Sequence, residues 1–252
     1  MRLAFTLSTY RLFDFIHLGI KQLRALRPDA PILLSDDFSP ESVFIKQLAK
    51  EQNVEYVGSD KRRGHFAGDM QSLVSAIMFA DVVEADLAIK ISQRFMLRLP
   101  EAIEVIERAF EDPSIAMAIP GQPKGTMGGK ASKGFSEFAV LSDIVCVRPS
   151  QFPASRMLEI YRRRIVEEKV PWKTFIEAAV HEAHMKLGAQ SKLLPELTDH
   201  GDQANPIYLR RYQNTEAQYV ALANKHGITG RFPLAEWGLI QGKGYMAKPV
   251  VV

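Results

Sequence analysis

The 252-residue chain has one cysteine and no long run of apolar residues. Because Cys146 has no partner in the chain, an internal disulfide is excluded, and its apolar neighbours lead us to expect a packed side chain in a reducing, cytoplasmic setting. No stretch of about 18 apolar residues occurs, so we expect no transmembrane segment. The formal net charge of +3 is small, and the basic residues form no long tract. This pattern favours local anion sites over a nucleic-acid-binding surface.

Apolar residues make up 46% of the chain, enough for one sizeable core, and segments with strand and helix spacing alternate through its first half. The predicted strands are 3–7, 31–35, 54–58, 87–91 and 115–119. The predicted helices are 13–26, 40–49 and 69–83, with Ser39 as the N-cap and Pro40 as the first residue of the second helix. A fourth predicted helix runs through Ile103, Val105, Ile106 and Phe110. This alternation predicts an α/β fold with a mostly parallel sheet and helices on both faces.

The pattern changes after Pro120. Residues 121–134 contain five glycines and three lysines and have little to bury, so we expect a surface loop there. A strand is predicted over 140–147, as an antiparallel element, and the remaining predictions are helices over 155–168, 172–187 and 216–226 and a short strand at 193–194.

Polar side chains follow each of the first four predicted strands. They are Ser8, Thr9, Tyr10 and Arg11, then Ser35, Asp36 and Asp37, then Ser59, Asp60 and the basic run 61–63, and then Ser92, Gln93 and Arg94. Ligands of open α/β sheets bind outside the carboxyl ends of the strands. Aspartate accepts hydrogen bonds from a base or a ribose hydroxyl, and arginine and lysine bind phosphate oxygens, so these ends predict a nucleotide site. For Asp37, the alternative is that it only caps a helix.

The order of these motifs resembles the GT-A glycosyltransferases, which transfer sugars from nucleotide-diphosphate sugars. Residues 7–11 are similar to the end of the first strand of that family, and residues 33–41 resemble its second-strand signature of apolar residues followed by paired aspartates. Residues 64–69 are similar to its glycine-rich approach to the next helix, and residues 85–94 to the strand that leads into its Asp-x-Asp motif. The resemblance covers about residues 1–150 and more weakly the remainder.

The resemblance implies a single Rossmann-like GT-A domain over residues 1–252, with a mostly parallel central sheet flanked by helices. Residues 1–150 would form the nucleotide-sugar-binding half, and residues 151–252 a helical half on the acceptor side. The expected activity is hexosyltransferase-like, with a glycan, a lipid-linked molecule or a protein as the acceptor. The residues expected to bind the donor are Thr9, Tyr10, Arg11, Asp36, Asp37, Asp60, Arg63, Asp69, Ser92, Gln93, Arg94, Lys124, Lys130 and His200.

The chain departs from the family where the Asp-x-Asp carboxylates are expected. Residues 92–94 read Ser-Gln-Arg, which offers Mg²⁺ or Mn²⁺ no carboxylate oxygen, so a metal would need carboxylates from elsewhere in the chain. We expect fixed cations to neutralise the diphosphate leaving group instead, from Arg94, the basic run 61–63 and the loop lysines Lys124 and Lys130. Lys90 is a further cation, although strand alternation directs it toward a helix-covered face. For the 121–134 loop, the alternative is a solvated connector.

An inverting transfer needs a carboxylate that takes the proton of the acceptor hydroxyl. Glu177, Asp143 and Asp199 are the candidates, and for each the alternative is an ordinary surface charge. His181 and His184 are three residues apart, whereas the zinc-peptidase helix motif needs four, so the spacing argues against a zinc peptidase.

Two other functions are compatible with the same pattern. One is a non-catalytic nucleotide- or sugar-binding protein of the same fold in a polysaccharide system. The other is a nucleotidyltransferase, which would need a glycine-rich basic loop directly after the first strand. Residues 8–11 contain no glycine, so we rank that class lower.

Overall fold

The computed structural model describes residues 1–121, 142–164, 176–198, 205–210 and 214–233. Its main sheet has the strands β1 (Leu3–Thr9), β2 (Ile32–Asp36), β3 (Glu55–Gly58), β4 (Leu87–Ser92), β6 (Met117–Pro120), β7 (Ile144–Val147) and β8 (Ser191–Leu194). Their order across the sheet is β3-β2-β1-β4-β7-β6-β8. All neighbours are parallel except β7, which is antiparallel to both β4 and β6. The predicted α/β class and the predicted antiparallel strand are confirmed.

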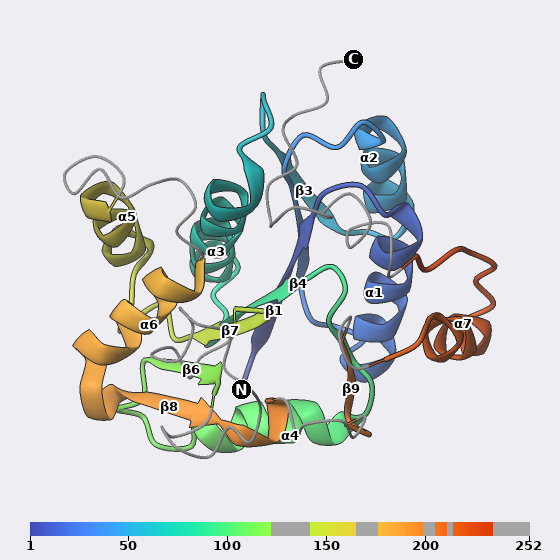
Figure 1. Cartoon of the computed structure of the whole chain (residues 1–252). Coiled ribbons are helices and arrows are strands. Elements are labelled where there is room, and N and C mark those ends of the chain that lie inside the picture. Colours follow the sequence, from blue (N-terminus) through green and yellow to red (C-terminus); the bar gives the residue numbers. More distant parts are fainter. Residues whose placement is uncertain (122–141, 165–175, 199–204, 211–213, 234–252) are drawn as a thin grey trace, which may run out of the picture.

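Helices cover both faces of this sheet (Figure 1). They are α1 (Phe13–Leu26), α2 (Ser42–Glu51), α3 (Gly64–Val82), α4 (Pro100–Ala109), α5 (Ala154–Arg162), α6 (Ile176–Leu187) and α7 (Glu216–Lys225). Helices α1, α2 and α4 pack on one face, and α3, α5 and α6 pack on the other. None of the described helices is long and apolar enough to cross a membrane.

Alternation along the two central strands sorts large and small side chains between the faces. Leu3, Phe5 and Leu7 of β1 contribute to the cluster with α1 and α2, whereas Ala4 of β1 and Ala88 of β4 belong to the cluster with α3. The small side chains on the second face leave room for α3 to lie close to the sheet. All five are at most 3% exposed, so this central part of the sheet is buried on both faces.

Two predicted helix starts are wrong, and one carboxylate explains the second of them. Helix α2 begins at Ser42, and Ser39 is not its N-cap, because the Ser39 hydroxyl donates to Asp36 instead. Helix α3 begins at Gly64, five residues before the predicted start at 69. The Asp37 carboxylate accepts hydrogen bonds from the backbone N–H groups of Arg63 and Gly64, which have no partner within the helix. Because the capping carboxylate directly follows β2 and is far from α3 in the sequence, no local sequence pattern predicts where α3 begins.

A second, two-stranded sheet was not predicted, because its strands are only two residues long. It pairs β5 (Met96–Leu97) with β9 (Tyr208–Leu209). Helix α7 packs beside it against α1, through Phe15, Leu18 and Tyr219. The predicted end of α7 is confirmed, because His226 is the C-cap and Gly227 adopts a left-handed φ of 66°.

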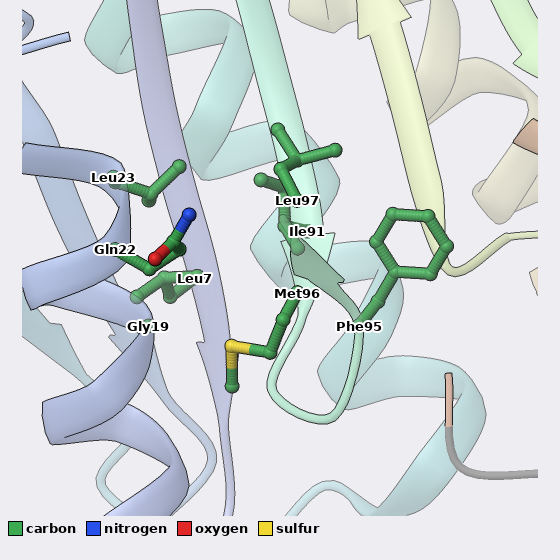
Figure 2. Close-up of a pocket in the computed structure, with 8 residues that line it drawn as sticks. All are labelled: Leu7, Gly19, Gln22, Leu23, Ile91, Phe95, Met96 and Leu97. Carbon is green, nitrogen blue, oxygen red and sulfur yellow. The ribbon is translucent and has the colours of Figure 1, made fainter. Parts of the chain in front are cut away.

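A small cavity lies in the apolar layer under α1 (Figure 2). The centre of a water molecule can occupy about 10 Å³ of this cavity, which is room for one water molecule. It is far too small for a sugar or a nucleotide. The lining residues are Leu7, Gly19, Gln22, Leu23, Ile91, Phe95, Met96 and Leu97.

Gln22 joins three parts of the fold beside this cavity. Its amide nitrogen donates to the carbonyl oxygen of Arg98 at 3.0 Å, so its amide oxygen accepts from Nε2 of His226 at 2.8 Å. Burial, followed by the charges of Lys21 and Lys225, lowers the pKa of His226 below its ordinary value. Burial also lowers the pKa values of His17 and His184.

We predict that the free energy of unfolding decreases between pH 7.5 and pH 5.5. The folded state disfavours the protonated form of these three histidines, so the unfolded state binds more protons as the pH falls below about 6.5. Urea denaturation at the two pH values checks this, and His226→Gln should decrease the difference while His184 and His17 retain their share. Equal or greater stability at pH 5.5 would contradict the prediction.

Candidate functional site

The carboxyl ends of the four parallel strands meet at one edge of the sheet. Thr9 of β1 is level with Asp36 of β2, Asp36 is level with Gly58 of β3, and Ser8 is level with Ser92 of β4. Strand β7 runs the other way, so its first residue, rather than its last, lies at this edge. The residues predicted to bind the nucleotide-sugar donor, at the ends of all four strands, therefore lie at the same edge as the residues that precede β7.

Asp36, which was predicted to contact a nucleotide, is a buried support of this edge. It is 1% exposed, and its carboxylate accepts from the Thr9 hydroxyl at 3.1 Å and the Tyr56 hydroxyl at 2.9 Å. It also accepts from the hydroxyl and the backbone N–H of Ser39. Burial, together with the Asp36 carboxylate, raises the pKa of Tyr56. A ligand could reach Asp36 only by displacing these donors, so its role is to hold the loops in place.

Asp37 behaves as the alternative interpretation predicts, because it caps a helix. Its two oxygens accept from the backbone N–H groups of Arg63 at 2.8 Å and Gly64 at 3.0 Å. Partial burial raises the pKa of Asp37, and these two hydrogen bonds oppose the shift. Gly68 allows the approach, since a Cβ at this position would lie 2.7 Å from Oδ2 of Asp37. Asp37 thereby links the end of β2 to the start of α3.

Two arginine guanidinium groups lie near the ring of Tyr10. The guanidinium of Arg62 is 4.2 Å from the centre of its ring, and that of Arg11 is 5.4 Å away. The backbone of Tyr10 is held by Gln93, whose amide oxygen accepts from the Tyr10 N–H at 2.9 Å and whose amide nitrogen donates to the Tyr10 carbonyl at 3.1 Å. Gln93 is thus a clamp between the ends of β1 and β4.

The remaining charged residues of the β3–α3 connection are at the surface. Asp60 is 80% exposed by side chain, and its carboxylate lies 3.7 Å from the guanidinium of Arg63, which is 44% exposed. A surface pair at this distance contributes little to stability, so both groups are free to turn toward an incoming ligand.

Lys90 and Asp69 form a buried ion pair beneath this edge. The distance between Nζ of Lys90 and Oδ1 of Asp69 is 3.0 Å, and the two side chains are 1% and 13% exposed. Nζ also donates to the Ser92 hydroxyl at 3.2 Å and to the Ser142 carbonyl at 3.1 Å. Lys90 faces α3, as strand alternation predicts, so its charge serves this network and is not presented to a ligand. Asp69 is partly buried, and its Oδ1 is directed at this lysine.

Glu177 continues the network from the first turn of α6. Its Oε1 accepts from the Ser142 hydroxyl at 2.6 Å. Its Oε2 is buried and has no hydrogen-bond partner among the residues that the structure describes. A carboxylate with one anchored oxygen and one unengaged oxygen has the arrangement that a general base needs.

Asp143, the second predicted base, is held by a counter-ion. The distance between its Oδ2 and Nε of Arg210 is 2.6 Å, a close ion pair without the angle of a hydrogen bond. Its backbone carbonyl accepts from the N–H of Ser92 at 2.7 Å. Next to this pair, the Tyr219 hydroxyl donates to the carbonyl of Arg94 at 2.6 Å, and burial raises the pKa of Tyr219. Helix α7 thus anchors the backbone that carries Arg94.

The structure does not place every predicted residue. Asp199, His200, Lys124 and Lys130 lie outside the described parts of the chain, and so does the 121–134 loop beyond its first residue. Sequence reasoning did not find Ser142, Arg210 or Tyr219. The sequence does carry a signal for Ser142. Residues that precede a strand antiparallel to its neighbours lie at the edge of the sheet where the neighbouring strands end.

Comparison with known proteins gives structural matches alone. No family model matches the chain, and no curated protein matches its sequence. The mannosyltransferase PcManGT from Pyrobaculum calidifontis, solved in complex with GDP-Man and Mn²⁺, has a TM-score of 0.50 at 11% identity, over 93% of this chain and 67% of that one. The chain has the GT-A fold.

Two further solved structures have slightly lower scores. The galactosyltransferase LgtC, in complex with donor and acceptor sugar analogues, has a TM-score of 0.49 at 9% identity, over 77% of this chain and 73% of that one. A cytidylyltransferase from Leptospira borgpetersenii has a TM-score of 0.48 at 11% identity, over 95% of this chain and 94% of that one.

The GT-A fold implies Mg²⁺ or Mn²⁺ at the end of β4, and the side chains there do not fit such an ion. Gln93 uses its amide on the Tyr10 backbone, and the Ser92 hydroxyl accepts from a lysine. In the described parts of the chain, no three His, Cys, Asp or Glu side chains come together as a metal site would require. The third residue of this triplet, Arg94, is a cation and offers no oxygen ligand.

We predict strong coupling between Lys90 and Asp69. Lys90→Met should lower the free energy of unfolding by about 3–5 kcal/mol, because it removes the positive charge that lies 3.0 Å from the Asp69 carboxylate. Asp69→Asn in the same chain should recover at least about 1 kcal/mol of this loss. Chemical denaturation of the two single variants and the double variant measures the coupling.

The surface pair Arg27–Glu107 is the matched control. Its atoms are 2.7 Å apart, but its side chains are 36% and 26% exposed, so the corresponding cycle should give a coupling of about 0.2–1 kcal/mol. Additive effects at Lys90 and Asp69 would show that the pair does not organise the network.

Proposed function

We propose that the chain is a glycosyltransferase, of a hexosyltransferase type, that moves a sugar from a nucleotide-diphosphate sugar to an acceptor. The observation that carries the proposal is the convergence of polar and cationic strand ends at the ligand-binding edge of a GT-A sheet. The acceptor is a glycan, a lipid-linked molecule or a protein. Residues 1–150 bind the donor in this proposal, and residues 151–252 form the acceptor side.

The donor site is built on Tyr10 and the connections around it. The Tyr10 ring offers an aromatic face, and Arg11, Arg62 and Arg63 supply positive charge beside it. Thr9 and Gln93 hold this platform in place from β1 and β4. These contacts support a nucleotide base and diphosphate at this edge, because arginine forks match phosphate oxygens.

Fixed cations meet the charge of the leaving group in this proposal. The bond between the sugar and the diphosphate breaks with a build-up of negative charge on the diphosphate, and preorganised positive groups lower that barrier. Arg94 is the cation best placed for this role, since its backbone is anchored by Tyr219 and follows β4 directly. The proposed site therefore works without the Asp-x-Asp carboxylates, while Lys124, Lys130 and His200 stay proposed further donor contacts.

Glu177 is the proposed general base. It removes the proton of the acceptor hydroxyl as the oxygen attacks the anomeric carbon, and the nucleotide diphosphate leaves with the bonding electron pair. The unengaged Oε2 favours Glu177 over Asp143, whose carboxylate is neutralised by Arg210. Asp199 remains the third candidate.

We predict that the chain binds at least one nucleoside diphosphate. Isothermal titration with the uridine, guanosine and cytidine diphosphates, with and without Mn²⁺, measures this. Arg94→Gln should weaken binding of the diphosphate about tenfold or more, through loss of a charge-assisted contact. Arg156→Gln, on the exposed side of α5, is the matched control and should bind as the unchanged protein does. No binding by any of the three ligands would contradict the donor site.

We predict that Glu177→Gln lowers the rate of sugar release from the bound donor about 100-fold or more, because glutamine cannot take a proton. Glu159→Gln, an exposed residue of α5, is the control and should leave the rate unchanged. The measurement is donor hydrolysis, with water as the acceptor. Donors that bind and stay intact would instead assign the chain the role of a non-catalytic binding protein.

A further inference from the structure

Three large apolar side chains stand out from the connection between β2 and α2. Phe38 is 52% exposed, Val43 is 72% exposed and Phe44 is 67% exposed. A turn closed by a hydrogen bond of 3.0 Å from the N–H of Ser42 to the carbonyl of Ser39 joins Phe38 to the first turn of α2. We refer to Phe38, Val43 and Phe44 as the apolar rim.

The backbone holds Phe38 in this outward position at a cost. Its φ is 59°, in the left-handed region that a bulky side chain rarely adopts. The hydrogen bonds of its neighbours fix the conformation, since Asp37 caps α3 and Ser39 is bound to Asp36. A strained residue that exposes an aromatic ring instead of burying it points to a contact outside the chain.

Basic residues lie directly beside the apolar rim. Arg11 donates its backbone N–H to the Ser39 hydroxyl at 2.8 Å, and Arg63 donates its backbone N–H to Asp37 at 2.8 Å, so both chain neighbours of Phe38 touch a basic segment. The connections that carry them lie at the same end of the sheet (Figure 1). The exposed basic residues here, which we refer to as the basic rim, are Arg11, Lys61, Arg62 and Arg63.

Acidic groups do not cancel this charge. Asp37 is turned inward onto two backbone N–H groups, and Glu41 is only partly exposed, with one oxygen buried. Asp60 is the exposed carboxylate of this region, and it lies within 3.7 Å of Arg63. The surface beside the apolar rim is therefore positive.

We propose that the apolar and basic rims dock the protein on the surface of an anionic lipid bilayer. Exposed phenylalanine and valine side chains enter the boundary between headgroups and acyl chains, while arginine and lysine bind lipid phosphates in the same plane. The complementary charge favours this occupant over a second copy of the chain, which would bring two basic rims together. The basic rim shares Arg11, Arg62 and Arg63 with the proposed donor site, whereas Val43, Phe44 and Lys61 belong to the docking surface alone. Loss of vesicle binding in Val43→Ser/Phe44→Ser is therefore distinguishable from failure of the proposed transfer activity.

Vesicle sedimentation with the full chain tests the proposal. We expect binding to phosphatidylcholine vesicles that contain phosphatidylglycerol, weaker binding to vesicles of phosphatidylcholine alone, and a decrease at high salt. Val43→Ser/Phe44→Ser should weaken binding about tenfold or more, because the apolar contact is lost. Lys61→Gln/Arg62→Gln should weaken it about fivefold for each charge removed.

Val82→Ser/Met185→Ser is the matched control, since these residues are 80% and 65% exposed on α3 and α6. It should bind vesicles as the unchanged protein does. Val43→Ser/Phe44→Ser and Val82→Ser/Met185→Ser should unfold at the same denaturant concentration. The proposal is overturned if the protein binds neither kind of vesicle, or if Val43→Ser/Phe44→Ser binds undiminished. It is also overturned if the apolar rim mediates a dimer, seen by light scattering and lost in Val43→Ser/Phe44→Ser.

Discussion

The binding edge of this protein depends on one buried carboxylate. Asp36 accepts hydrogen bonds from Thr9 of β1, Tyr56 of β3 and Ser39 of the β2–α2 connection. Three separate chain segments are therefore fixed relative to one another at the level where the strands end. Removing the carboxylate would leave several buried donors without a partner, at about 1–3 kcal/mol each. This arrangement also positions more exposed groups nearby, such as Tyr10, which directly follows Thr9.

A second network extends the edge toward the other half of the chain. Lys90, which alternation turns toward α3, joins Asp69 to the residues before β7, and Ser142 passes the connection to Glu177 on α6. Glu177 is thereby held in register with the end of β4, although 85 residues separate it from Ser92 in the chain. The proposed base and the proposed donor site are parts of one polar layer, covered by helices from both halves.

Periodicity predicted the main sheet and its helices because long apolar patterns carry that information. It could not predict the partners of polar groups, since Asp37 caps a helix that starts 27 residues later and Lys90 pairs with a residue of another element. The same limit explains the wrong N-cap, because Ser39 donates its hydroxyl to Asp36 rather than to α2. Of the candidate site, the strand-end residues were predicted as a set, whereas their division into buried supports and exposed contacts needed the structure.

The proposed donor site is tested most directly by a crystal structure with a bound nucleoside diphosphate. It predicts the base beside the Tyr10 ring and the diphosphate within hydrogen-bond distance of Arg94 or the basic run 61–63, at the carboxyl ends of β1, β3 and β4. Asp36 should keep its hydrogen bonds to Thr9 and Ser39 in that complex. A nucleotide bound at any other face of the sheet, or one that displaces the donors of Asp36, would contradict it.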